Sequence, residues 1–229
     1  MNRNYLMDFL RLFFPSYCYG CRGPMIRFEE VLCTICLRQA PWRRLQNQIV
    51  RQSRLVTGPP FEHSFSLLDF RKGGLAQRLL HELKYNNHPE IGVRLGRMLG
   101  IEMVKSGFAG KFDLIIPVPL HTSRRRVRGF NQSTVIAEGI GEMIGAPVDE
   151  TIVLRNRRTN TQTSKDRQGR WVNIHDAFSV KTPEKIAGRH ILLTDDVITT
   201  GATMTAFASR VHKHGPASMS IASIAEVGG

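Results

Sequence analysis

Apolar residues along the chain fall into two alternating patterns, one typical of buried strands and the other of amphipathic helices. Short uncharged runs and alternating bulky residues predict strands at 61–70, 112–116, 148–154, 177–180, 191–193 and 218–226. Helices are predicted at 75–84, 91–103, 131–143 and 202–214, the first two from apolar residues spaced three and four apart. Because strands alternate with helices, we expect an α/β fold with a mostly parallel sheet flanked by helices.

The stretch 191–203 joins an apolar strand to two acids and a turn rich in hydroxyl groups. We expect Asp195 and Asp196 to lie where the strand ends, which is where open α/β sheets bind ligands. The turn that follows consists of Thr199, Thr200, Gly201, Ala202 and Thr203. It can wrap a phosphate, because unpaired N–H groups and the dipole of the next helix favour an anion. The acids would then hold ribose hydroxyls, or a Mg²⁺ through water, beside it. The alternative is an ordinary strand-to-helix turn with a solvated acid pair.

A run of arginines follows the strand predicted at 112–116. The segment Pro117–His121 closes this strand, and its two prolines stiffen the exit. The arginines beyond it include Arg124, Arg126 and Arg128. Fixed positive charges suit a pyrophosphate, and the planar fork of arginine binds phosphate oxygens well. The alternative is a solvated basic face without a ligand.

A long polar connection runs from Arg155 to Asp176, with few apolar residues and many charges. Long polar connections inside a compact domain are usually lids or binding loops, and a disordered insert is the alternative. We therefore expect residues 157–170 to close over the ligand and exclude water that would otherwise hydrolyse it.

All four cysteines lie near the N-terminus in two C-x-x-C pairs, Cys18 with Cys21 and Cys33 with Cys36. Two such pairs can offer four thiolates to one Zn²⁺ in tetrahedral geometry. Four thiolates leave no open position on the metal, so a structural role is favoured over a catalytic one. Redox-active or free thiols are the alternative interpretation.

Composition and charge narrow the class of protein. The chain has 229 residues and a formal net charge of +13, which favours polyanionic partners such as nucleic acid or a polyphosphate substrate. No segment approaches membrane-spanning length, because the apolar stretch 6–14 is short and interrupted by charges. We therefore expect a cytoplasmic protein that does not insert into membranes. We divide it into residues 1–58, with an N-terminal helix, the cysteine ribbon and a basic linker, and a larger domain at 59–229.

Several motifs together resemble the ComF family, which includes the GntX-like proteins of bacteria. The stretch 191–203 is similar to the PRPP-binding motif of type I phosphoribosyltransferases, apart from Thr194, where that family usually has an aliphatic residue. The other motifs are the four cysteines, Lys84-Tyr85, Pro117–His121, Arg128–Ser133, Arg158-Thr159 with Gln162, Arg170–Asn173 and Asp195–Thr203. The resemblance covers nearly the whole chain and is specific in its combination.

The resemblance implies a zinc ribbon joined to a type I phosphoribosyltransferase fold that binds PRPP with Mg²⁺. It implies that Asp195 and Asp196 are the catalytic pair and hold the ribose hydroxyls, and that residues 199–203 cradle the 5′-phosphate. It also implies that the pyrophosphate meets the exit of the preceding strand, through Pro119, His121, Arg124, Arg126 and Arg128. Zinc would be held by Cys18, Cys21, Cys33 and Cys36.

Three functions are compatible with these features. The first is natural competence, DNA uptake or the use of external DNA by a ComF-like protein whose domain binds PRPP, either as a pentosyl transferase or as a PRPP-responsive protein. The second is a non-catalytic accessory that binds single-stranded DNA, or a helicase or recombination-mediator protein, through its basic surface. The third is a purine-salvage phosphoribosyltransferase, which would need a hood that reads the base, and no such segment is identifiable.

Overall fold

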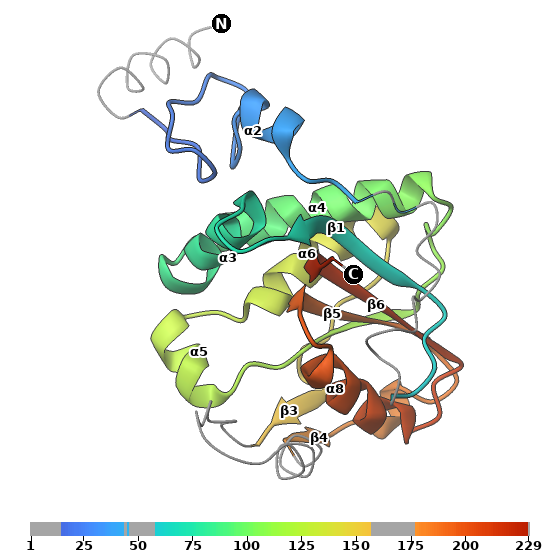
Figure 1. The fold of residues 1–229 in the computed structure, drawn as a ribbon. Coiled ribbons are helices and arrows are strands. Elements are labelled where there is room, and N and C mark those ends of the chain that lie inside the picture. Colours follow the sequence, from blue (N-terminus) through green and yellow to red (C-terminus); the bar gives the residue numbers. More distant parts are fainter. Residues whose placement is uncertain (1–14, 44, 46–57, 157–176, 229) are drawn as a thin grey trace, which may run out of the picture.

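The computed structural model of the protein describes residues 15–43, 45, 58–156 and 177–228. Within these residues, four parallel strands form one sheet in the order β1-β6-β5-β2 (Figure 1). Their bounds are β1 Ser64–Phe70, β2 Leu114–Pro117, β5 His190–Ile198 and β6 Ser218–Val227. Two shorter strands, β3 (Val153–Arg155) and β4 (Phe178–Val180), pair antiparallel apart from this sheet. The α/β fold with a mostly parallel sheet is confirmed.

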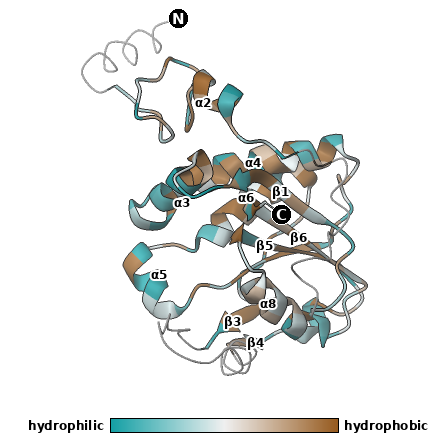
Figure 2. Ribbon diagram, viewed as in Figure 1, coloured by the Kyte–Doolittle hydropathy of each residue, from teal (hydrophilic) through white to brown (hydrophobic). Residues whose placement is uncertain are grey.

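Helices cover both faces of the sheet. The long helices are α3 (Leu75–Tyr85), α4 (Pro89–Lys105), α6 (Gln132–Ile144) and α8 (Ala202–His212). Successive side chains of β5 point into the hydrophobic clusters on opposite faces of the sheet. Leu192 packs with α3, α4 and α6, whereas Ile191 and Leu193 pack with α8 and β4. Figure 2 shows hydrophobic positions along the strands and a mixture of hydrophobic and hydrophilic positions on α3 and α4. The sheet is thus buried on both faces, as a parallel sheet requires.

Helices α4 and α6 touch through their backbones at two glycines. A Cβ added to Gly139 would lie 2.2 Å from the carbonyl oxygen of Val93. One added to Gly96 would lie 2.3 Å from the carbonyl oxygen of Ile136. No side chain fits at either position without moving the helices, so these glycines set the distance between α4 and α6.

The cysteine-containing segment packs onto the same side of the molecule as α3 and α4. It consists of a tight turn, closed by an antiparallel bridge between Tyr17 and Pro24, and the short helix α2 (Thr34–Gln39). Buried Cys18 and Leu32 belong to the same hydrophobic cluster as Leu75 and residues of α4. The first half of the predicted ribbon is therefore a turn, and the second half begins a helix.

Both edges of the sheet are covered by short extended segments. On the β1 side, the backbone N–H of Asp69 donates to the Pro41 carbonyl (2.9 Å) and that of Arg43 donates to the Leu67 carbonyl (3.0 Å). On the β2 side, Ile115 donates to Pro147 (2.8 Å). These contacts occupy backbone groups that an uncovered edge would present to solvent.

The structure corrects two sequence predictions. Strand β5 does not end before the acids but continues through Asp195 and Asp196 to Ile198, because its ladder with β6 runs on to the pair Ile198 and Glu226. The strand predicted at 148–154 is shorter and later, at 153–155, with Val148 in an isolated bridge to β2.

A short helix, α5 (Thr122–Arg128), was not predicted among the arginines. The predicted lid at 157–170, the segment 6–14 and the proposed domain boundary at 58 lie in or beside residues outside the described part of the chain, so these stay predictions. Among the described residues, no helix has the length and apolar character to cross a bilayer.

Candidate functional site

Asp195 lies near the carboxyl end of β5, facing the start of α6. One of its carboxylate oxygens, Oδ1, accepts a hydrogen bond from the Ser133 hydroxyl (3.0 Å) and another from the backbone N–H of Asp196 (2.8 Å). Burial and the negative charge of Asp196 together raise the pKa of Asp195 to about 7. Its carboxylate is thus held in position by hydrogen bonds while its ionised form is disfavoured.

Asp196 contacts a different helix, because successive side chains of a strand point in opposite directions. Its carboxylate lies 2.7 Å from the ammonium nitrogen of Lys84, in the last turn of α3. Asp196 is only 4% exposed, whereas Asp195 is partly exposed. The two acids are therefore adjacent in sequence but diverge in space, each with its own partner.

The turn after β5 has the properties of an anion site. Thr199 and Thr200 are exposed, and Gly201 adopts a left-handed conformation (φ 75°) directly before α8. The eleven-residue helix α8 begins at Ala202, so its first backbone N–H groups have no carbonyl within the helix to bind. Hydroxyl groups and a helix N-terminus thus meet close to Asp195, as the sequence predicts for residues 199–203.

The exit of β2 lies beside β5, since the N–H of Val118 donates to the Thr194 carbonyl (2.8 Å). Pro119 is buried there. His121 caps α5, with its Nδ1 accepting from the backbone N–H of Ser123 (3.2 Å). This nitrogen is engaged within the protein, which favours a structural role over a role as general base.

The arginines of α5 differ in their surroundings. Arg124 and Arg126 are exposed. Arg128 is partly buried, and its guanidinium lies 5.5 Å from the centre of the Tyr85 ring. Burial lowers the pKa of Arg128, and the negative charge of Asp196 acts in the opposite direction. The charge of Asp196 thus acts on Arg128, whereas the contact of Arg124, Arg126 and Arg128 with a pyrophosphate stays a prediction.

Three residues at this site had no assigned role in the sequence prediction. They are Lys84, which pairs with Asp196; Ser133, which donates to Asp195; and Arg155 of β3. Burial lowers the pKa of Arg155, whereas the charge of Asp195 raises it, so Asp195 faces a cation as well. Lys84 and Ser133 stand inside motifs that the sequence analysis singled out, whereas nothing in the sequence marked Arg155.

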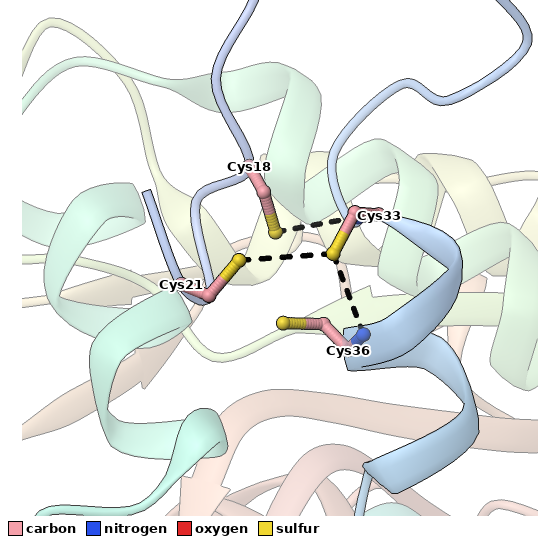
Figure 3. A group of neighbouring side chains, drawn as sticks. All are labelled: Cys18, Cys21, Cys33 and Cys36. Carbon is pink, nitrogen blue, oxygen red and sulfur yellow. Dashed lines mark hydrogen bonds between the residues drawn. The ribbon is translucent and has the colours of Figure 1, made fainter. Parts of the chain in front are cut away.

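The four cysteines converge, as Figure 3 shows. Their sulfur atoms all lie within 4.8 Å of one another, and those of Cys21 and Cys33 are 3.7 Å apart. Bonds of about 2.3 Å from sulfur to a tetrahedral zinc correspond to sulfur separations of about 3.8 Å. No disulfide joins them. The cluster thus has the size and donor set of a single metal site.

Backbone amides surround these sulfur atoms. Cys18 Sγ accepts from the N–H groups of Gly20 and Cys33, both at 3.3 Å, and Cys33 Sγ accepts from Cys36 (3.4 Å). Burial raises the pKa of Cys18, but these amide hydrogen bonds outweigh it and lower the value to about 7. These donors favour the thiolate of Cys18, which is the form that binds metal. Burial and the neighbouring thiols instead raise the pKa of Cys36, and the pKa of Cys33 is also raised although the N–H of Cys36 lowers it.

Comparison with known proteins agrees with this arrangement. The model of the phosphoribosyl transferase domain matches residues 131–228, which include Ser133, both acids and the turn 199–203. The chain is 29% identical to the DNA utilization protein YhgH of Escherichia coli O6:H1, with 90% of this chain and 95% of that protein covered.

Two other relatives are similar over most of this chain. Competence protein F of Haemophilus influenzae is 28% identical, covering 88% of this chain and 80% of its own. Competence protein ComFC of Bacillus subtilis is 26% identical, covering 84% and 76%. These relatives, the matched domain and the cysteine cluster agree with the resemblance drawn from the motifs. Together, these findings support a protein of the ComF family with a phosphoribosyltransferase fold.

Proposed function

We propose that the protein binds PRPP, or a similar phosphorylated ribose, at the carboxyl end of β5. The observation that carries this proposal is the meeting of two acids with an exposed hydroxyl-rich helix N-terminus on one strand. Asp195 and Asp196 would hold the ribose hydroxyls, while residues 199–203 would bind the 5′-phosphate through N–H and hydroxyl groups. The exit of β2, with Arg124, Arg126 and Arg128, would meet the pyrophosphate.

Mg²⁺ would enter with the substrate and neutralise part of the pyrophosphate charge. The fit is supported by the donor set, since carboxylates and phosphate oxygens are the ligands that Mg²⁺ prefers. The residues of the chain would then position C1 of the ribose for attack by an amine or base nitrogen, with pyrophosphate as the leaving group. Charge stabilisation and positioning would supply most of the acceleration, and His121 is disfavoured as a general base because its Nδ1 caps α5.

We also propose that the four cysteines bind a structural Zn²⁺. The cluster offers thiolates alone, and four thiolates at tetrahedral distance favour zinc over harder cations. A segment this small buries little surface by itself, so the metal would hold it together. Because thiolates that bind a metal persist in a reducing compartment, we also propose a cytoplasmic location. Metal analysis of the purified protein tests the assignment, and one zinc per chain is the expected result.

Calorimetric titration with PRPP and Mg²⁺ tests the pocket. We expect the wild-type protein to bind, and the double variant Asp195→Asn with Asp196→Asn to bind at least tenfold more weakly. Asp149→Asn is the matched control, because this acid pairs with Lys185 and lies away from the turn after β5. No heat from the wild type, or equal affinity in the double variant, would refute the pocket.

A release assay for pyrophosphate then asks whether the bound sugar is transferred. PRPP would be offered together with nucleobases, amines or single-stranded DNA, one acceptor at a time. Release with a single acceptor would establish both the reaction and its substrate. Binding without release for any acceptor would instead support a sensor of phosphorylated ribose.

A second function is favoured by the relatives, whose names refer to competence and DNA utilization. With a net charge of +13 and exposed Arg124 and Arg126, the protein has a surface suited to single-stranded DNA. Alternatively, the protein would take part in DNA use by binding a helicase or a recombination mediator, without contacting DNA itself. Binding to labelled single strands should weaken steeply with salt, and binding independent of salt would contradict direct contact with DNA.

A further inference from the structure

Three residues of the first cysteine turn make polar contacts with α3 or with the start of α4. The hydroxyl of Tyr19 donates to Glu90 (2.8 Å) and lies 3.0 Å from Nδ1 of His88. The Gly20 carbonyl accepts from the guanidinium of Arg78 in α3 (2.8 Å). The third contact is an ion pair between Arg22 and Glu82. Contacts from Gly20 and Arg22 thus attach the cysteine turn to α3, and those from Tyr19 attach it to the start of α4.

These contacts lie over a packed interface. Glu82 is only 7% exposed and also accepts from the side-chain amide of Asn86 (2.8 Å), so it joins the cysteine turn to the end of α3. A Cβ on Gly20 would lie 2.6 Å from the side chain of Leu75, which leaves no room between the turn and the helix. The cysteine turn is therefore tightly packed against α3, and we expect the two to move together.

The same helix brings Lys84 to the proposed pocket. Lys84 stands two residues after Glu82, and its ammonium lies 2.7 Å from the carboxylate of Asp196. The Lys84 side chain is 23% exposed and that of Asp196 is 6% exposed, so the lysine is the more accessible partner. An ammonium group has three donors, so Lys84 could bind oxygen atoms of a ligand while it stays beside Asp196.

We propose that Lys84 is a binding residue for the phosphorylated sugar, and that the metal-bound cysteine turn positions it. This inference rests on the proposed function, because it concerns the same pocket. Lys84 would hold Asp196 in place and add a positive charge beside the incoming ligand. Loss of the metal would loosen the turn, release the end of α3 and weaken the pocket. Because coupling between two binding sites is reciprocal, the bound sugar would raise the affinity for zinc by the same factor.

The test uses the full, zinc-loaded chain, two variants that touch neither the metal nor the pocket, and one variant in the pocket itself. Tyr19→Phe removes the hydroxyl that contacts Glu90 and His88, and Glu82→Gln removes the charge that pairs with Arg22. Tyr17→Phe is the matched control, because Tyr17 is equally close to Cys18 but is 52% exposed. Lys84→Met removes the charge in the pocket, and zinc content is measured for every variant.

We expect Tyr19→Phe and Glu82→Gln to keep one zinc per chain, yet to bind PRPP with Mg²⁺ at least threefold more weakly. Lys84→Met should weaken binding at least tenfold, and Tyr17→Phe should bind as the wild type does. Amide hydrogen exchange at residues 82–88 should speed up in Tyr19→Phe, which reports on positioning without any ligand. Competition with a chelator should show tighter zinc binding when PRPP is present, and Lys84→Met should abolish this effect.

The outcomes separate this inference from the proposed function. If the wild type binds PRPP but both Tyr19→Phe and Glu82→Gln bind equally well, the cysteine turn does not position the pocket, although the pocket stands. If Lys84→Met binds as tightly as the wild type, Lys84 is not a ligand. If the wild type does not bind PRPP at all, both proposals fall, and unchanged exchange at residues 82–88 would further exclude the structural link.

Discussion

Replacing Asp195 with asparagine should make the protein more stable, and this gain in stability should grow as the pH rises. Asparagine keeps an oxygen that can accept from Ser133 and from the N–H of Asp196, but it cannot ionise. The wild-type carboxyl has its pKa raised to about 7 by burial and by the charge of Asp196. In the folded protein the ionised form therefore costs free energy that the variant avoids.

The size and sign of the effect follow from linkage. Below pH 4 the carboxyl is protonated in both the folded and unfolded states, so the substitution changes little. Between about pH 4 and 7 the unfolded chain loses this proton while the folded chain keeps it, so wild-type stability falls as pH rises. A pKa of about 7, against the ordinary 3.8, sets an upper bound of about 4 kcal/mol on this loss above pH 7. Because Lys84 and Asp196 respond to the same charge, we expect a gain of about 1–3 kcal/mol at pH 8.

Urea unfolding of both proteins at intervals from pH 5 to 8.5, without Mg²⁺ or PRPP, measures this difference. Asp149→Asn is the control. Burial raises the pKa of Asp149, but its hydrogen bonds from Lys185 and Thr151 outweigh this and lower it. The stabilisation from ionised Asp149 is fully present above the pKa that this carboxyl has in the unfolded chain. The loss of stability in Asp149→Asn should therefore be constant from pH 5 to 8.5. A difference for Asp195→Asn that is flat with pH, or a loss of stability at pH 8, would refute the reasoning.

Two further predictions concern packing and the metal. Gly139→Ala should cost about 1–3 kcal/mol in urea unfolding, because the new Cβ would meet the carbonyl oxygen of Val93 and force α4 and α6 apart. Glu138→Ala, at an exposed neighbouring position, should change stability by less than about 0.5 kcal/mol, and a stabilised Gly139→Ala would contradict the close approach. Removing zinc with a chelator should lower the melting temperature and increase binding of a hydrophobic dye, since the cysteine turn covers part of the core. An unchanged melting curve after complete removal would show that the metal does not support the fold.

Much of the fold was predictable, because its determinants are local. Apolar runs with two periodicities mark the strands and helices, and their alternation leads to a parallel sheet. The cysteine cluster was predictable for the same reason, since two C-x-x-C pairs bring their sulfur atoms together over a short loop. The turn at 199–203, which we propose binds a phosphate, also depends on residues that are neighbours in sequence.

The contacts that were missed join distant parts of the chain. The length of β5 is set by its ladder with β6, which the apolar run 191–193 does not reveal. The pairing of Lys84 with Asp196 depends on how α3 lies over the sheet. In the sequence, a lysine in the last turn of a helix is equally well explained by its favourable interaction with the helix dipole. Helix α5 was missed because a cluster of like charges disfavours a helix locally, whereas here His121 caps it and Glu150 pairs with Arg125.

The coverage of both sheet edges has a practical consequence. The outer backbone groups of β1 are capped by the segment that leads out of the cysteine region, through the Pro41 and Arg43 contacts. A phosphoribosyltransferase domain expressed alone from residue 59 would therefore present a bare strand next to uncovered apolar side chains of α3. We expect such a fragment to associate with itself through that strand and precipitate, and the whole chain to aggregate less under the same conditions.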